Sequence, residues 1–250
     1  MRRVLVTGGA GFIGSHFIRI LLAEEADAQV VNLDVLTYAG NLANLADVAS
    51  SPRYRFVRGD IRDMKVAQEL AADADWIVNF AAESHVDRST KARAGEFIDT
   101  NVYGAYVMLE ATRQVNRGAR FLQVGTDEVY GDVPFPEFPN ERAMLAPSSP
   151  YSAAKAGADH IALAFHRTHQ MDVIVSRCTN NYGPNQYPEK VIPVFVTNAL
   201  DGEPLPLYDG GTQVRDWLRV EDHCRALLLL LRRGAAGEIY NIGANQTPEV

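Results

Sequence analysis

The sequence contains few cysteines and no long apolar run. Its two cysteines, Cys178 and Cys224, lie far apart and lack the spacing of a metal site, which is typical of reduced thiols in a cytosolic protein. The longest late apolar run, residues 226–231, falls far short of the roughly 20 residues that span a bilayer. The apolar run near the N-terminus is too short for a signal peptide. We therefore expect a soluble, cytoplasmic protein without a membrane partner.

Positive charge is also scarce. The 24 lysines and arginines are outnumbered by 31 acidic residues, and the net charge of −7 argues against nucleic acid or an anionic membrane as a partner. Lysine occurs at only four positions, so the placement of Lys155 and Lys190 is informative. The 250 residues, 47% of them hydrophobic, suffice for one sizeable domain with a small second lobe.

Short β-branched runs alternate with longer helical patterns along most of the chain. This alternation predicts an α/β fold of the Rossmann type, in which a doubly wound parallel sheet is covered by helices on both faces. Such a sheet binds ligands at the carboxyl ends of its strands. The predicted strands lie near residues 3–7, 29–33, 55–58, 76–80, 120–124 and 173–177, and the predicted helices near residues 12–23, 66–71, 94–115, 152–169 and 192–200.

The regular alternation weakens after residue 178. Prolines and a glycine pair between residues 184 and 211 predict loops and short elements outside the main sheet. We therefore expect a cofactor domain over residues 1–178, to which some later segments return, and a smaller C-terminal substrate lobe over residues 179–250. Because the chain stops shortly after a strand-and-turn pattern at residues 240–243, we expect this lobe to be incomplete.

The first predicted strand runs into a glycine turn and a helix start. Gly8, Gly11 and Gly14 allow a tight turn, close approach of the backbone to a pyrophosphate, and binding of phosphate at a helix N-terminus. Asp34 ends the second predicted strand, where a carboxylate accepts hydrogen bonds from the adenosine ribose and repels a 2′-phosphate. The carboxylate at Asp34 therefore favours NAD over NADP. Asp60 and Ile61 follow the third strand and either frame the adenine or cap a helix.

Two pairs of residues indicate chemistry. Tyr151 and Lys155 are i and i+4, so they share one face of a predicted helix. An ammonium beside a phenol lowers the pKa of the phenol, which can then take the proton of an alcohol as hydride leaves. Asp127 and Glu128 stand side by side after another predicted strand, where like charges split their pKa values and give one acid and one base. Adjacent residues can share a pocket only beyond the strand end.

The chain resembles the extended short-chain dehydrogenase/reductase family, the NAD-dependent epimerases and dehydratases, over essentially all of its length. Several motifs in the right order are far more specific than any one of them. These motifs occupy residues 7–14, 36–42, 79–89, 126–131, 151–155, 180–184 and 215–218.

The resemblance is strongest to the nucleotide-sugar 4,6-dehydratases of the family, and it implies a hydro-lyase that acts on dTDP-glucose with NAD⁺. In the implied mechanism, Tyr151 and Lys155 remove the proton of the 4-hydroxyl while hydride passes from C4 to NAD⁺. Glu128 then removes the C5 proton, Asp127 protonates the 6-hydroxyl so that water leaves, and the hydride returns to C6. The product is a nucleotide-bound 4-keto-6-deoxy sugar.

The resemblance also assigns contacts, with the nucleotide sugar held mainly by residues 179–250. It implies a homodimer as well. The implied cofactor contacts are Gly8, Gly11, Phe12, Ile13, Gly14, Asp34, Leu36, Thr37, Asp60, Ile61, Ala81, Ala82, Ser84, Thr100, Tyr151, Lys155 and Asn181. The implied substrate contacts are His85, Thr126, Asp127, Glu128, Asn180, Lys190, Val191, Leu207, Tyr208 and Arg215, of which Thr126 is also expected to assist catalysis.

Three other functions remain open. A nucleotide-sugar 4-epimerase uses the same tyrosine–lysine pair but needs no acid–base pair for C5 and C6. A uronate decarboxylase needs no acid to expel a 6-hydroxyl, so Asp127 argues against it. A non-catalytic NAD-binding protein often lacks the tyrosine or the lysine, and this sequence has both.

Overall fold

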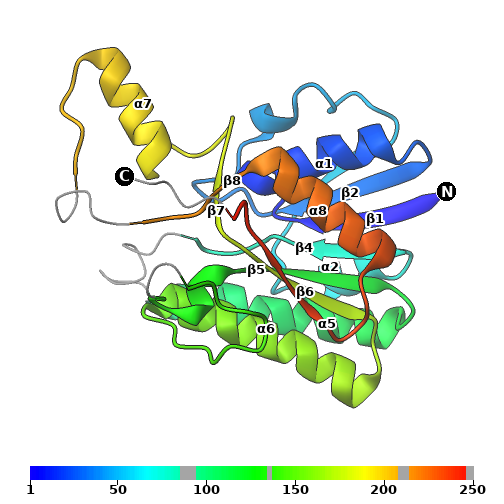
Figure 1. The fold of residues 1–250 in the computed structure, drawn as a ribbon. Helices are drawn as coiled ribbons and strands as arrows, with labels where there is room; N and C mark the ends of the chain where they lie inside the picture. Colours follow the sequence, from blue (N-terminus) through cyan, green and yellow to red (C-terminus); the bar gives the residue numbers. More distant parts are fainter. Residues whose placement is uncertain (85–93, 134–136, 208–213, 246–250) are drawn as a thin grey trace.

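A parallel sheet of seven strands forms the centre of the protein in a computed structural model that describes residues 1–84, 94–133, 137–207 and 214–245 (Figure 1). The strand order is β3-β2-β1-β4-β5-β6-β9, and every neighbouring pair is parallel. The predicted Rossmann-type fold is confirmed. The strands are β1 (Arg2–Thr7), β2 (Ala28–Asp34), β3 (Tyr54–Arg58), β4 (Trp76–Asn79), β5 (Arg120–Thr126), β6 (Val173–Cys178) and β9 (Ile239–Ile242).

The order of the strands creates a crevice. The chain adds β2 and β3 on one side of β1 and then crosses to add β4, β5 and β6 on the other side. A ligand site forms at such a reversal, because the loops on either side diverge at the carboxyl ends of the strands. β4 and β6 are buried along their whole length, which explains why each begins with a run of three apolar residues.

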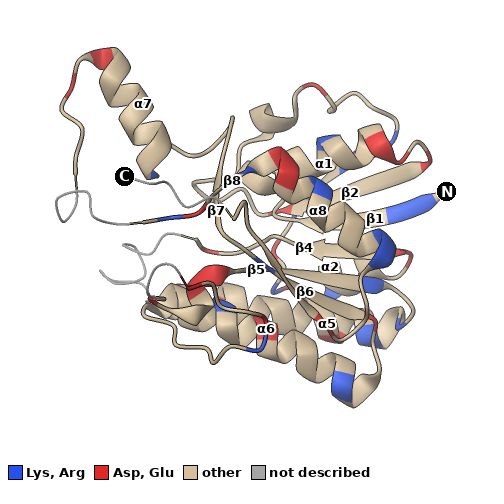
Figure 2. Cartoon of the chain, in the orientation of Figure 1, with Lys and Arg blue, Asp and Glu red and all other residues tan. Residues whose placement is uncertain are grey.

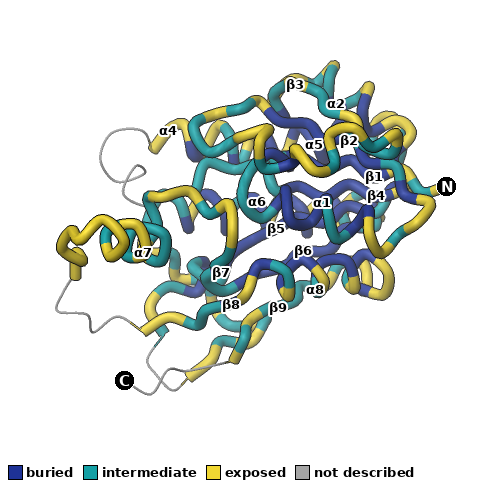
Figure 3. The backbone as a smooth tube through the Cα atoms, turned by 90° about the horizontal axis from the view of Figure 1, so that it is seen from above, coloured by how far each residue is buried: buried dark blue, intermediate teal, exposed yellow. Residues whose placement is uncertain are grey.

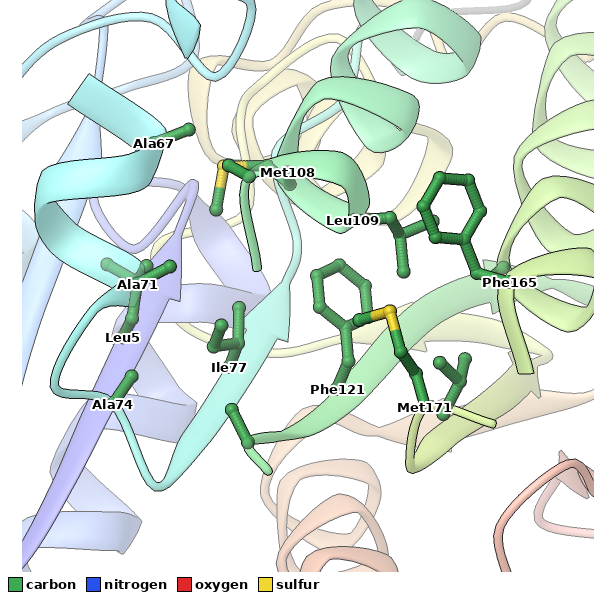
Figure 4. Close-up of a cluster of buried hydrophobic side chains, with 14 of the residues drawn as sticks. Leu5, Ala67, Ala71, Ala74, Ile77, Met108, Leu109, Phe121, Phe165 and Met171 are labelled. Carbon is green, nitrogen blue, oxygen red and sulfur yellow. The ribbon is translucent and has the colours of Figure 1, made fainter. Parts of the chain in front are cut away.

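Helices cover both faces of the sheet (Figures 1 and 3). One face carries α1 (Phe12–Glu24) and α8 (Val220–Arg233), which pack together through apolar residues such as Phe17 and Leu227. The other face carries α2 (Met64–Ala71), α5 (Gly104–Val115) and α6 (Pro150–His169). Met108, Leu109 and Phe121 belong to the buried cluster between these helices and the sheet (Figure 4).

Two elements differ from the prediction. The expected continuous helix over residues 94–115 is three pieces, namely α4 (Ala94–Phe97), the π-helical η2 (Ile98–Tyr103) and α5. Within η2, the side-chain amide of Asn101 accepts from the Glu83 amide at 2.8 Å and donates to the Glu83 carbonyl oxygen at 3.0 Å, which ties this turn to the end of β4. No helix was predicted where α8 lies, although α8 is amphipathic and packs with α1 on one face of the sheet.

The remaining elements lie beside the crevice. β7 (Asn180–Tyr182) and β8 (Trp217–Arg219) form a two-stranded parallel sheet. α7 (Val191–Asp201) projects from the body of the protein, and none of its residues is buried (Figures 1 and 3). Although they follow residue 178, α8 and β9 belong to the main sheet and its covering helices. Within the described ranges, no helix is both long enough and apolar enough to cross a membrane.

Candidate active site

A cavity of about 400 Å³ opens at the carboxyl ends of the central strands. It runs from the glycine turn after β1, past the ends of β4 and β5, to the segment between β7 and α7. Most of the residues that the sequence assigned to a site come together here. The predicted residues that line it are Gly8, Gly11, Phe12, Ile13, Gly14, Asp34, Thr37, Asp60, Ile61, Ala81, Ala82, Ser84, Thr100, Thr126, Glu128, Tyr151, Lys155, Asn180, Asn181, Lys190 and Val191.

The glycine turn has the geometry of a phosphate-binding loop. Gly8 has a φ of +69°, and a Cβ there would lie 2.7 Å from the amide nitrogen of Ala81, so only glycine fits. The Gly11 amide donates to the Gly8 carbonyl oxygen at 3.2 Å and precedes the first turn of α1. A Cβ on Gly14 would collide with the same carbonyl oxygen. The free amides at the start of α1 therefore face the cavity and can hold a pyrophosphate.

Asp34 lies at the adenosine end of the cavity. Its carboxylate accepts hydrogen bonds from the Ala10 amide at 2.9 Å and the Leu36 amide at 2.8 Å. Burial raises the pKa of Asp34, and the two backbone hydrogen bonds oppose that rise. Asp34 therefore ties the glycine turn to the loop after β2 and still faces the cavity. Thr37 lines the cavity as well, whereas Leu36 is not among its lining residues and adopts a φ of +60°.

Asp60 does not cap α2, because the N-cap of that helix is Asp63, whose side chain accepts from the Lys65 and Val66 amides. Asp60 instead forms an ion pair with Arg62, two residues later in the chain, with 2.6 Å between Asp60 Oδ2 and Arg62 Nη2. Burial raises the pKa of Asp60, but the hydrogen bonds from Arg62 outweigh it and hold the pKa below its ordinary value. The alternative in which Asp60 caps the helix is therefore wrong, and Asp60 and Arg62 both line the cavity.

Tyr151 and Lys155 lie on the first turns of α6. The helix begins with a capping box between Ser149 and Ser152, and Pro150 occupies its first turn. Lys155 is 5% exposed, and its Nζ donates to the Val124 carbonyl oxygen at 2.5 Å. Burial lowers the pKa of Lys155, which the charge of Asp159 partly offsets.

The expectation that Lys155 lowers the pKa of Tyr151 is wrong for the site as the structure has it. Burial raises the pKa of the Tyr151 phenol well above its ordinary value, and the charges of Glu128 and Asp127 raise it further. A hydrogen bond with Thr126 opposes the rise. The Lys155 ammonium donates to a backbone carbonyl oxygen instead.

Asp127 and Glu128 lie beyond the strand end, as expected. β5 continues through Gly125 to Thr126, and the short 3₁₀-helix η3 (Asp127–Tyr130) follows, with its acidic residues at the end of β5 (Figure 2). The Thr126 hydroxyl accepts from the Glu128 amide at 3.3 Å and lies 3.4 Å from Asp127 Oδ1. Glu128 lines the cavity, whereas Asp127 is not among its lining residues.

The two carboxyls differ in their electrostatic surroundings. Burial, followed by the charge of Glu128, raises the pKa of Asp127 to about 6. Burial also raises the pKa of Glu128, and the charges of Lys190 and then Arg215 offset part of that rise. Of these cations, Arg215 also lowers the pKa of Asp127. Glu128 therefore has one more cation that favours its charged form than Asp127 has.

The segment after β6 supplies the far wall of the cavity. The Asn181 side chain donates to the Thr179 carbonyl oxygen at 2.9 Å and accepts from His223 at 2.8 Å. Burial lowers the pKa of His223 to about 3, so its ring is neutral and Nδ1 carries the proton. Lys190 caps the start of α7, and its Nζ donates to the Ser84 carbonyl oxygen at 3.1 Å.

Five predicted substrate contacts are not placed in the cavity, and one of them is Asp127. His85 and Tyr208 fall outside the described residues. Leu207 is 67% exposed and does not line the cavity. Arg215 is exposed and also absent from the lining, yet its charge acts on both acidic residues of η3.

Sequence reasoning missed several residues that line the cavity. Tyr187 and Glu189 come from the proline-rich segment before α7, and Cys178 ends β6. Trp217 is partly exposed and lines the cavity as well. The polar and aromatic residues on either side of Pro188 were the available signal for Tyr187 and Glu189.

Comparison with known proteins places this geometry in a family. The family model described as GDP-mannose 4,6 dehydratase matches residues 5–250. The chain belongs to this family. A dTDP-glucose 4,6-dehydratase of Streptomyces niveus is 53% identical over 245 residues, which cover 96% of this chain and 72% of that protein. The family membership confirms the resemblance to NAD-dependent epimerases and dehydratases.

Solved structures of family members superpose on the chain. DesIV, a dTDP-glucose 4,6-dehydratase of Streptomyces venezuelae solved with NAD and TYD bound, is 53% identical with a TM-score of 0.94, and the match covers 98% of this chain and 77% of DesIV. A UDP-glucuronic acid 4-epimerase of Bacillus cereus is 27% identical with a TM-score of 0.92, covering 98% of this chain and 79% of the epimerase. Dehydratases and epimerases thus share the scaffold, and site residues must distinguish them.

Proposed function

We propose that the protein is a dTDP-glucose 4,6-dehydratase, which converts dTDP-glucose to dTDP-4-keto-6-deoxyglucose and water with a tightly bound NAD⁺. The observation that carries the proposal is that Glu128 lines the same cavity as Tyr151, with Asp127 beside it at the start of η3, and that the charges of both acids act on the Tyr151 phenol. A site built for epimerisation has no use for two acids at that place. The dehydratases of 50% identity and more support the same activity.

The cavity suits a dinucleotide. When NAD⁺ is bound, the α1 N-terminus would hold the pyrophosphate, Asp34 would accept hydrogen bonds from the ribose hydroxyls and disfavour a 2′-phosphate, and Asp60 would be available to the adenine. NAD⁺, when bound, accepts a hydride from C4 and returns it to C6. It also brings positive charge to a site where carboxylates hold the pKa of Tyr151 high.

The first task of the protein residues is to move the proton of the 4-hydroxyl. Tyr151 receives it, and Thr126, whose hydroxyl is a hydrogen-bond partner of the phenol, holds the oxygen in place. Lys155 fixes the helix against β5 through Val124 and contributes its positive charge. Burial of this pair excludes water and strengthens each of these interactions.

The second task is to remove a proton from C5 and deliver one to the 6-hydroxyl. Glu128 is the base, because Lys190 and Arg215 favour its charged form. Asp127 is the acid, because its pKa of about 6 leaves a useful protonated fraction near neutral pH. A 4-ketone makes the C5 proton acidic, so oxidation at C4 must precede this step.

Substrate selection is assigned to residues beyond β6. Lys190 and Arg215 supply positive charge for a diphosphate, Val191 starts α7 at the same point, and Asn180 lies at the cavity wall. The assignment of dTDP as the nucleotide carrier is based on the relatives, among them DesIV, which was solved with TYD bound. We assign residues 1–178, together with α8 and β9, to cofactor binding, and β7, β8 and α7 to the nucleotide sugar.

We further propose that the protein acts in the cytoplasm as a homodimer. Support comes from exposed apolar residues on η2 and α5, among them Ile98 at 56% and Tyr103 at 51% exposure. Light scattering of the purified protein tests the dimer. A mass of one chain at micromolar concentration contradicts it.

One experiment tests the activity. The purified protein is incubated with dTDP-glucose and, separately, with UDP-glucose, without added reductant, and the products are weighed by mass spectrometry. The proposal predicts a product of dTDP-glucose that is lighter by one water, with no net reduction of cofactor. A 4-epimerase leaves the mass unchanged, and that result with intact protein and cofactor contradicts the proposal.

A further inference from the structure

A fully buried ion pair lies behind the active site. Arg177 of β6 and Asp159 of α6 are 2% and 0% exposed, and Arg177 Nε donates to Asp159 Oδ2 at 2.9 Å. A buried pair of this kind is weak evidence for stability, because the loss of hydration offsets most of the attraction. Because the pair lies behind the catalytic cavity, positioning of the catalytic residues accounts for it better than stability does.

Asp159 connects the pair to the tyrosine–lysine helix. It lies four residues after Lys155, one turn further along α6, and its charge raises the pKa of that lysine. Its carboxylate also packs against Gly125, the residue of β5 that precedes Thr126. A Cβ on Gly125 would lie 2.9 Å from Asp159 Oδ1 and 2.6 Å from the Ser176 carbonyl oxygen.

Arg177 connects the pair to the acid–base turn. Its Nη1 donates to the Tyr130 hydroxyl at 2.9 Å, and its guanidinium carbon lies 5.0 Å from the centre of the Tyr130 ring. Tyr130 ends η3, the turn that begins with Asp127. The Tyr130 hydroxyl in turn donates to Asn241 Oδ1 of β9 at 2.7 Å. One guanidinium thus holds α6 with one nitrogen and η3 with another.

We propose that Arg177 is a positioning residue that fixes η3 against α6, so that the carboxyl pair and the tyrosine–lysine pair act on the same sugar. Arg177 lines no part of the cavity and acts only through Asp159 and Tyr130. The inference rests on the proposed dehydratase activity. It predicts that loosening this link uncouples elimination from oxidation, because α6 keeps its own anchors at Val124 and in its capping box while η3 loses one of its restraints.

Tyr130→Phe tests the link with the smallest change. It removes the hydroxyl that joins Arg177 to η3 and keeps the ring. In single turnovers with dTDP-glucose, we expect elimination to slow about 10-fold, the size of a lost hydrogen bond to a charged group, while C4 oxidation keeps its rate. Reduced nicotinamide should then accumulate in acid-quenched samples, exchange of the C5 hydrogen with D₂O should slow, and KM should change little.

Tyr54→Phe is the matched control. Tyr54 also loses a hydroxyl that is hydrogen-bonded to a buried side chain, Asn32 at 2.9 Å, but it lies on β3, away from the cavity. For Tyr54→Phe we expect the amount of reduced nicotinamide and the rate of C5 hydrogen exchange to match those of the wild type. Equal behaviour of Tyr130→Phe and Tyr54→Phe overturns the inference.

A second variant separates positioning from general loss of stability. Arg177→Lys keeps the charge but loses the fork that reaches Asp159 and Tyr130 together. Because both substitutions break the same link, the double variant Arg177→Lys/Tyr130→Phe should slow elimination no more than Arg177→Lys alone. If the double variant slows elimination by the product of the two single effects, the inference is overturned. If the wild type itself releases no water from dTDP-glucose, the proposed function fails; if it does, these variants test the positioning role alone.

Discussion

The ammonium of Lys155 donates a 2.5 Å hydrogen bond to the carbonyl oxygen of Val124, which joins the catalytic helix α6 to the end of strand β5. This bond explains why Lys155 and Tyr151 do not simply form a charge pair. Lys155 is buried, and one N–H of its ammonium donates to the Val124 carbonyl oxygen. The lysine therefore both anchors the helix and places positive charge behind the phenol.

Replacement of this lysine should affect oxidation first. Lys155→Met removes the charge and the hydrogen bond to the Val124 carbonyl oxygen, so C4 oxidation should slow about 100-fold or more. Single-turnover formation of reduced nicotinamide measures the effect. Lys65→Met on the exposed face of α2 is the control and should oxidise at the wild-type rate. Equal rates for both variants would show that Lys155 has no part in oxidation.

Glu128→Gln should stop the second half of the reaction and spare the first. The amide cannot accept the C5 proton, so exchange of C5 hydrogen with D₂O is lost, whereas hydride still passes from C4 to the cofactor. Mass spectrometry of recovered substrate, together with cofactor absorbance, measures both. Exchange at the wild-type rate would remove Glu128 from the role of base.

Asp127 should make both the elimination step and the fold favour low pH. Its pKa in the folded protein, about 6, exceeds the ordinary 3.8 because burial and Glu128 disfavour its charge. Elimination needs the protonated acid, so its single-turnover rate should fall as pH rises through about 6. The same shift favours folding below the unfolded pKa, and that contribution is lost as pH rises through the folded pKa.

Asp127→Asn should therefore stabilise the protein at pH 8 by an amount on the order of 1 kcal/mol and change little below about pH 4. Thermal unfolding across this range measures it. A stability difference that is independent of pH would contradict the raised pKa. Loss of elimination in the same variant is expected at every pH.

Gly125→Ala should damage the junction of α6 and η3. The added Cβ would lie 2.6 Å from the Ser176 carbonyl oxygen and 2.9 Å from Asp159 Oδ1, neither of which can move freely. We expect a loss of about 1–3 kcal/mol of unfolding free energy, as in other overpacked cores. Gly95→Ala in α4 is the control, because its Cβ meets no atom within 4 Å. Equal urea midpoints for the two variants would contradict the close packing at Gly125.

Local patterns carried much of the prediction. The strand, glycine turn and helix at residues 2–24 form a contiguous unit, so spacing alone located the phosphate loop. The i, i+4 spacing of Tyr151 and Lys155 likewise placed both on the cavity side of α6. The turn of Asp127 and Glu128 followed from the end of an apolar strand.

Long-range contacts limited the rest. The direction of the Tyr151 pKa shift depends on burial and on carboxylates 23 and 24 residues earlier in the chain, which outweigh its lysine neighbour. The π-helical turn at Thr100 depends on Asn101 reaching Glu83, and Tyr187 enters the cavity through the fold of a proline-rich loop. Arg177 gave no sequence signal, since a strand arginine is ordinarily exposed.

The most direct test follows the hydrogen that leaves C4. The protein is given dTDP-glucose that carries deuterium at C4, in ordinary water and without added cofactor, and the product is analysed by NMR. A sugar that is oxidised only temporarily must return its own hydrogen, so the account predicts a dTDP-4-keto-6-deoxy product with the deuterium at C6. Unchanged substrate, a C4 epimer, or a product without deuterium at C6 would contradict it.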